Sequence, residues 1–206
     1  MEVNSYCGNI LSMYDNPLLK SMEEQSSTLA DTRSFIEPDV ARLINTFILS
    51  LNAKSVLELG TCIGYSGIWM AEALKITDGL LTTIDYDIAL LKEAKTNFEK
   101  AGVSDRVKII EGDITEVTKR LPTGHFDLVF QDARKSLYPT MLEECIRLVR
   151  VGGVIIADDT LYSRKGTAEK IVSYLKEYNE LTLKDHMLYT TTIPVGQGLT
   201  ISVRLQ

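Results

Sequence analysis

The chain has 206 residues, of which 45% are hydrophobic and 24% are charged, a composition typical of one globular domain with its own core. The formal net charge of −6 argues against broad, non-specific binding of nucleic acids. No apolar run approaches the roughly 20 residues that a membrane-spanning helix needs, and the first residues do not resemble a signal peptide. Its three cysteines include no CxxC pair, which favours reduced thiols, so we expect a cytoplasmic protein.

The first helix with a clear apolar face begins at Pro38. Its apolar residues recur every three or four positions from Val40 to Leu51, the spacing of one helical face. We therefore expect a single domain over residues 1–206, made of an N-terminal helical appendage at 1–37 and a core at 38–206.

Beyond this helix, strand-like and helix-like segments alternate. Strands are expected at 55–60, 80–85, 107–113, 126–133, 152–159, 181–189 and 199–205. Helices are expected at 65–75, 88–101, 115–121, 138–149 and 166–179, with Gly102 and Gly152 ending the second and the fourth. This alternation predicts an α/β, Rossmann-like fold, in which a seven-stranded and mostly parallel sheet carries helices on both faces. No helix separates the last two strands, so they should form an antiparallel hairpin at one edge of the sheet.

A glycine-rich loop, VLELGTCIGYSG, follows the first strand. A dinucleotide site would have the pattern GxGxxG, whereas here Cys62 stands between Gly60 and Gly64. Glu58 would repel a pyrophosphate but would attract a cationic cofactor. S-adenosylmethionine carries an ammonium and a sulfonium group and no phosphate. The loop therefore favours this cofactor over NAD, with Glu58 anchoring its amino-acid end directly or through water.

Two more acidic residues end the next two strands. Asp85 is placed to accept hydrogen bonds from both ribose hydroxyls, as acids do at this position in nucleotide-binding folds. Asp113 lies where adenine is expected and could accept a hydrogen bond from its amino group. The competing interpretation is a tight strand-to-helix turn that binds no ligand. Acids on three successive strands argue against it.

Three further aspartates follow the fourth and fifth strands. Asp132 follows the fourth, and Asp158 and Asp159 follow the fifth, so the three should lie together. Carboxylates gathered at one place repel each other and raise a pKa, and a bound divalent cation removes that cost. Oxygen ligation favours Mg²⁺, with Mn²⁺ or Ca²⁺ as alternatives, over zinc or copper. The competing interpretation is that these are ordinary turn and capping residues.

The segments VLELGTCIGYSG, TIDYD, EGD, FDLVFQDARKSLYP, VGGVIIADDTLY and IPVGQGLTISVR follow in this order, within a match that covers about residues 35–204. Together they resemble the cation-dependent O-methyltransferases of the catechol and caffeoyl-CoA type. The resemblance implies that Asp132 and Asp158 bind the metal and that Asp159 occupies a position where the family usually has asparagine. It also implies a set of cofactor-binding residues: Glu58, Gly60, Cys62, Gly64, Ser66, Asp85, Asp113, Ile114 and Asp132.

Lys135 matches the lysine that acts as the general base in this family. The positive charges of a bound cation and of the sulfonium would lower its pKa toward the working pH. The alternative is a surface lysine in a charged loop beside Arg134. Tyr138 is expected to start the next helix rather than to touch substrate.

The expected reaction is methyl transfer to a hydroxyl of a small, vicinal-dihydroxy aromatic substrate, by a homodimer as the resemblance implies. The late acidic residue of catechol methyltransferases is absent, and Thr191 and Thr192 occur there instead, which disfavours catechol itself. Two alternatives remain open. One is methylation of a hydroxylated tRNA base, favoured by Arg164 and Lys165, and the other is a non-catalytic protein that binds S-adenosylmethionine.

Overall fold

The computed structural model describes residues 16–28, 35–161 and 168–206, and it divides the chain into two compact units, Met1–Phe35 and Ile36–Gln206. In the first unit, helix α2 (Pro17–Thr28) is preceded by Asn16, whose side-chain oxygen accepts a hydrogen bond from the Leu18 amide at 2.9 Å. Arg164 and Lys165, on which the RNA alternative depends, lie outside the described residues.

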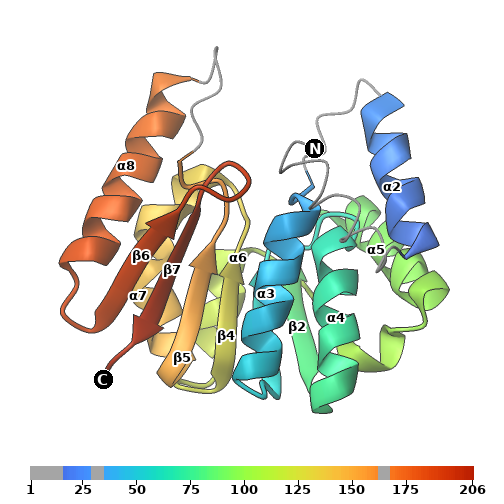
Figure 1. Cartoon of the computed structure of the whole chain (residues 1–206), viewed down its shortest axis with the longest axis horizontal. Coiled ribbons are helices and arrows are strands. Elements are labelled where there is room, and N and C mark those ends of the chain that lie inside the picture. The colour runs from blue at the N-terminus through green and yellow to red at the C-terminus, as the bar shows by residue number, and fades with distance from the viewer. Residues whose placement is uncertain (1–15, 29–34, 162–167) are drawn as a thin grey trace, which may run out of the picture. The chain divides into compact units, whose positions relative to one another are not determined.

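The second unit is built on a seven-stranded sheet in the order β3-β2-β1-β4-β5-β7-β6 (Figure 1). All neighbouring strands pair in parallel except β7, which is antiparallel to both β5 and β6. The predicted fold class, including the antiparallel C-terminal hairpin, is confirmed. The strands are β1 (Ser55–Leu59), β2 (Leu80–Asp85), β3 (Val107–Glu111), β4 (Phe126–Gln131), β5 (Val149–Ala157), β6 (Leu188–Ile193) and β7 (Leu199–Arg204).

In this unit, one helix precedes β1, and further helices connect the strands from β1 to β6. They are α3 (Pro38–Ser50), α4 (Tyr65–Thr77), α5 (Ile88–Ala101), α6 (Ile114–Val117), α7 (Tyr138–Leu148) and α8 (Glu169–Lys184), with short 3₁₀ turns η2 (Ser104–Arg106), η3 (Thr118–Arg120) and η4 (Lys135–Leu137). One core cluster joins β1, β4 and β5 to α7 and α8, with Leu57, Val129, Ile155, Cys145 and Tyr178 among its members. Because strand side chains alternate between faces, the neighbour of Leu57, Glu58, faces the opposite side, toward α4.

The two largest differences from the predicted element boundaries lie at the end of α8 and the start of β6. Helix α8 continues to Lys184, and β6 begins only at Leu188. The buried residues of α8, Leu175, Tyr178 and Thr182, recur at helical spacing, whereas Leu181 and Leu183 are 42% and 62% exposed. Their alternation with polar residues imitates a strand.

The prediction that Gly152 ends a helix is also wrong. Helix α7 ends at Leu148 and β5 begins at once with Val149. Gly152, with a φ of 74°, lies in an irregular part of β5, where the pairing with β4 shifts register between Phe126 and Leu128.

The strand order reverses between β1 and β4. From β1 the chain proceeds to β2 and β3 on one side, and from β4 to β5 on the other. Open α/β sheets bind ligands in the crevice outside the carboxyl ends of their strands at such a reversal. In the described part of the chain, none of the helices combines the length and apolar character needed to cross a membrane.

Candidate active site

Most of the predicted site residues lie at the carboxyl ends of strands next to the reversal point. Gly60 follows β1, Asp132 follows β4, and Asp158 follows β5. Backbone hydrogen bonds hold these ends together, from the Asp132 amide to the Leu59 carbonyl at 3.1 Å and from the Asp158 amide to the Gln131 carbonyl at 3.2 Å. The glycine loop and the three aspartates are therefore parts of one rim.

The glycines of the loop are required by close packing inside the protein. Gly60 has a φ of 107°, and a Cβ there would lie 2.7 Å from the Asp132 carbonyl oxygen. A Cβ on Gly64 or Gly67 would lie 2.8–2.9 Å from the ring of Phe98 on α5. Gly64 and Gly67 thus let α4 approach α5. This packing requirement is not visible in the spacing of the glycines along the sequence.

Asp85 ties the end of β2 to the glycine loop. Its Oδ2 accepts a hydrogen bond from the Cys62 amide at 3.0 Å, and its Oδ1 accepts one from the Asp87 amide at 3.1 Å. Cys62 has a left-handed backbone with a φ of 46°, which is uncommon outside glycine. The carboxylate that is predicted to hold the ribose therefore also fixes the shape of the loop.

Glu58 is completely buried beneath the start of α4. Its Oε1 accepts a hydrogen bond from the Ser66 hydroxyl at 2.5 Å, and its Oε2 accepts one from the Thr83 hydroxyl at 2.6 Å. Burial raises the pKa of Glu58 to about 8, although these two hydrogen bonds oppose the shift. Both oxygens are used within the protein, and Thr83, which accounts for one of them, was not among the predicted site residues.

Asp113 and Ile114 have structural roles at the start of α6. Asp113 Oδ1 caps the helix by accepting hydrogen bonds from the Thr115 amide at 2.8 Å and from its hydroxyl at 2.5 Å. These bonds hold the pKa of the exposed Asp113 below its ordinary value. Ile114 is buried in the core cluster. The predicted adenine contact would have to use the other oxygen of Asp113.

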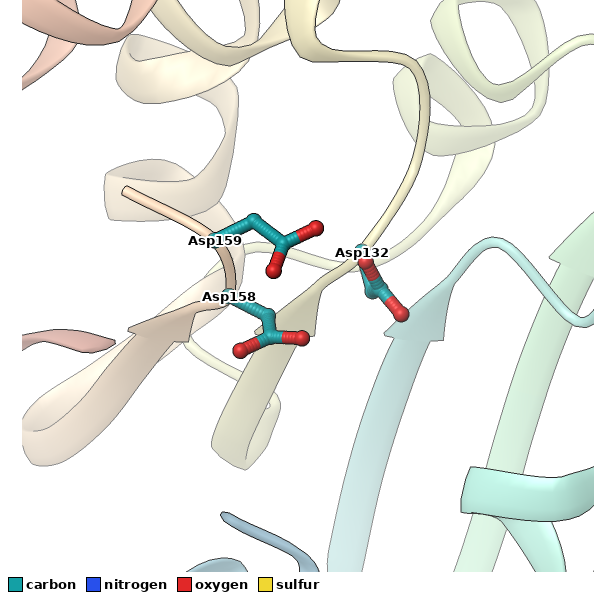
Figure 2. A group of neighbouring side chains, drawn as sticks. All are labelled: Asp132, Asp158 and Asp159. Atoms are coloured by element: carbon teal, nitrogen blue, oxygen red, sulfur yellow. The ribbon is translucent and has the colours of Figure 1, made fainter. Parts of the chain in front are cut away.

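The structure brings the three aspartates together. One oxygen from each of Asp132, Asp158 and Asp159 lies within 4.8 Å of the other two, and Figure 2 shows the side chains at the ends of two neighbouring strands. Burial and the charges of its two neighbours raise the pKa of Asp158 to about 8. Burial also raises the pKa of Asp132; the Lys135 ammonium opposes this shift and the Asp159 carboxylate adds to it.

The donor set fits a hard divalent cation. Asp158 is buried, and its Oδ1 has no hydrogen-bond partner among the described residues. A buried carboxylate oxygen without a partner is costly, and two more carboxylates beside it add repulsion. A divalent cation would satisfy the free oxygen and balance the charge, and oxygen ligands suit Mg²⁺, Mn²⁺ or Ca²⁺.

Lys135, in turn η4, is the positive charge beside the aspartates. Its Nζ lies 3.2 Å from Asp132 Oδ1 and 3.3 Å from Asp159 Oδ2. Burial works against its charge, but the Tyr138 hydroxyl and the two carboxylates hold the pKa of Lys135 well above its ordinary value. The expectation of a lowered pKa counted only the positive charges of a cofactor and a cation, and the carboxylates act in the opposite direction.

Tyr138 is a site residue that the sequence analysis missed. It does begin helix α7, as predicted, but its buried hydroxyl also accepts a hydrogen bond from Lys135 Nζ at 2.8 Å. The signal was present in the sequence as the three-residue spacing of Asp132, Lys135 and Tyr138. This spacing is part of the resemblance to the family, but the sequence prediction assigned Tyr138 only to the start of a helix.

The fold and this rim define a Rossmann-like protein of the methyltransferase type, and comparisons with known proteins identify its family. Residues 9–205 match the family model described as O-methyltransferase. An inferred O-methyltransferase of Mycobacterium sp. (strain JLS) is 34% identical over 174 residues, which cover 82% of this chain and 79% of the relative. The chain belongs to the O-methyltransferase family.

Solved structures agree with this assignment. An inferred caffeoyl-CoA O-methyltransferase from Staphylococcus aureus is 26% identical with a TM-score of 0.83, covering 98% of this chain and all of that one. The O-methyltransferase TomG from Streptomyces achromogenes, solved in complex with S-adenosylmethionine, has the same fold, with a TM-score of 0.81 at 23% identity and complete coverage of both chains.

Proposed function

We propose that the chain transfers a methyl group from S-adenosylmethionine to a hydroxyl of a small, vicinal-dihydroxy aromatic substrate held beside a divalent cation. The observation that carries the proposal is the group of three carboxylates, with a buried and unpartnered Asp158 oxygen, placed next to the glycine loop. Membership of the O-methyltransferase family supports the reaction type. A homodimer, with twice the chain mass of 23.0 kDa, is part of the same proposal.

Each group of the site has a part in this reaction. When bound, S-adenosylmethionine supplies an electrophilic methyl group, and the cation supplies a charge that favours ionisation of the substrate hydroxyl. Asp132, Asp158 and Asp159 hold the cation, and Mg²⁺ is the first choice. The charges of a bound cation and of the sulfonium would favour loss of the Lys135 proton, and the neutral amine would then accept the hydroxyl proton at Nζ. Positioning of the hydroxyl against the methyl group provides much of the remaining acceleration.

The remaining residues bind the methyl donor. Asp85 accepts hydrogen bonds from the ribose at the end of β2, next to the Cys62 amide. Ser66 and Thr83 occupy both oxygens of Glu58, so Glu58 does not contact the methyl donor directly. Because the Ser66 hydroxyl donates its hydrogen to Glu58, its oxygen keeps lone pairs that can accept a hydrogen bond from the ammonium group of S-adenosylmethionine. We therefore assign Glu58 the role of orienting Ser66 toward this ammonium group.

The test is methyl transfer from labelled S-adenosylmethionine to a panel of catechols, with EDTA and after restoration of Mg²⁺, Mn²⁺ or Ca²⁺. We expect EDTA to abolish transfer and Mg²⁺ to restore it. Transfer that is unaffected by EDTA would contradict the assignment of the aspartates to a cation. Tight binding of NAD instead of S-adenosylmethionine would contradict the methyltransferase itself.

A further inference from the structure

We propose that the hydroxyl of Tyr138 is the group that positions Lys135 at the active site. This inference rests on the proposed function, in which Lys135 acts on the substrate hydroxyl. Tyr138 touches neither the predicted donor loop nor a predicted substrate group, so it is a positioning residue. Its ring is completely buried under the ends of β4 and β5.

The contacts of Lys135 single out Tyr138. Four oxygens lie within 3.3 Å of Lys135 Nζ: Tyr138 Oη at 2.8 Å, Asp132 Oδ1 at 3.2 Å, Asp159 Oδ2 at 3.3 Å and the Asp158 carbonyl at 3.3 Å. An ammonium group has three hydrogens to share among them. Tyr138 offers the shortest distance. The two carboxylates are also proposed cation ligands. The Tyr138 hydroxyl is the side-chain partner of Lys135 to which no role in cation binding is assigned.

Tyr138 is itself held in place. Its hydroxyl has one hydrogen and faces two backbone acceptors, the Gln131 carbonyl at 2.9 Å and the Asp158 carbonyl at 3.0 Å. These carbonyls lie at the ends of the neighbouring strands β4 and β5. Gln131 directly precedes the predicted cation ligand Asp132, and Asp158 is itself a predicted cation ligand. A side chain fixed in this way sets the position of Lys135 relative to Asp132 and Asp158.

Replacement of Tyr138 by phenylalanine removes this hydroxyl and little else. The edge-to-face contact with Tyr178, with ring centroids 5.4 Å apart, remains. The Gln131 carbonyl still accepts a hydrogen bond from the Asp158 amide, and the Asp158 carbonyl still has Lys135 within 3.3 Å. We therefore expect Tyr138→Phe to fold.

Tyr178 provides the matched control. Its hydroxyl is buried and has no hydrogen-bond partner in the part of the chain that the structure describes. Tyr178→Phe removes the same atom from the same ring pair without removing a hydrogen bond, so it should leave the site unchanged.

The experiment combines two measurements on Tyr138→Phe, Tyr178→Phe and the unaltered chain. In the first, the lysines carry ¹³C at Cε, and the Lys135 signal is identified by its loss in Lys135→Arg. Two distinct Hε shifts for Lys135 indicate a fixed side chain. In the second, kcat and KM are measured with labelled S-adenosylmethionine and the best catechol of the panel.

We expect Tyr138→Phe to merge the two Hε shifts and to lower kcat by about 10- to 100-fold, with KM for S-adenosylmethionine within about twofold. Tyr178→Phe should change neither. The inference is overturned if Tyr138→Phe keeps both shifts, or if Tyr178→Phe alters them equally. Merged shifts with an unchanged kcat would support the positioning of Lys135 by Tyr138 and count against the proposed function. If no catechol is methylated, the Hε shifts alone still decide whether Tyr138 positions Lys135.

Discussion

The proposed reaction depends most on the role of Lys135. A general base must lose its proton, yet two carboxylates and Tyr138 favour the charged amine. The two possible roles, base and fixed positive charge, are separated by arginine, which keeps the charge and does not release a proton in proteins.

We expect Lys135→Met and Lys135→Arg both to lower kcat by about 10²- to 10⁴-fold, the usual contribution of a general base. Steady-state kinetics with labelled S-adenosylmethionine measure this. If Lys135→Arg instead keeps most of the activity that Lys135→Met loses, Lys135 acts as a fixed charge. Circular dichroism provides the control for folding.

The burial of Glu58 predicts how stability depends on pH. Its pKa is raised from 4.5 to about 8, so the folded chain keeps a proton that the unfolded chain releases. Stability therefore falls as pH rises from the ordinary carboxyl range to about 8. We expect Glu58→Gln to reduce this fall, measured by urea unfolding at about pH 5 and about pH 9. An equal fall in the variant would mean that Glu58 is ionised in the folded chain.

At the level of elements, the contact between α4 and α5 explains the spacing of the glycines. Gly67 lies in α4, where a Cβ would approach the Phe98 ring to 2.9 Å. We expect Gly67→Ala to lower the free energy of unfolding by about 1–3 kcal/mol, the usual cost of overpacking. In a Phe98→Leu background the same change should cost less, because the ring that it meets is gone.

Urea unfolding of the two single variants and the double variant gives the coupling between the positions. A coupling energy near zero would show that contact with the Phe98 ring is not the reason for glycine at position 67.

The elements also show how far local patterns reach. Strands β1 and β2 and helix α5 lie within one residue of their predicted bounds, and α3 begins at Pro38 as predicted. At α5 the periodicity agrees with both ends of the helix, which Asp87 caps at the start and Gly102 ends. The prediction failed at residues 181–187, where Leu181 and Leu183 alternate with polar residues but are exposed. Packing against the sheet, which local pattern does not contain, decided in favour of α8.

At the scale of the whole molecule, strand order makes the site. Asp132, Asp158 and Asp159 are separated by up to 27 positions in the sequence, and they meet because β4 and β5 are neighbours. The sequence predicted this grouping because parallel strands present their carboxyl ends at one edge. It could not predict that Asp158 is buried with a free oxygen, because burial depends on side-chain depth. The spacing of Lys135 and Tyr138 places the two residues near each other, but the 2.8 Å contact depends on side-chain direction.

Binding of Mn²⁺ tests the central claim, that the three aspartates form a site for a divalent cation, most directly. Electron paramagnetic resonance counts the free ion during titration of the unaltered chain, of Asp158→Asn and of Asp105→Asn, a control on the exposed turn η2. We predict one saturable site in the unaltered chain and in Asp105→Asn, and affinity lower by at least about 10-fold in Asp158→Asn. Equal binding by all three proteins, or no saturable site in the unaltered chain, would contradict the account.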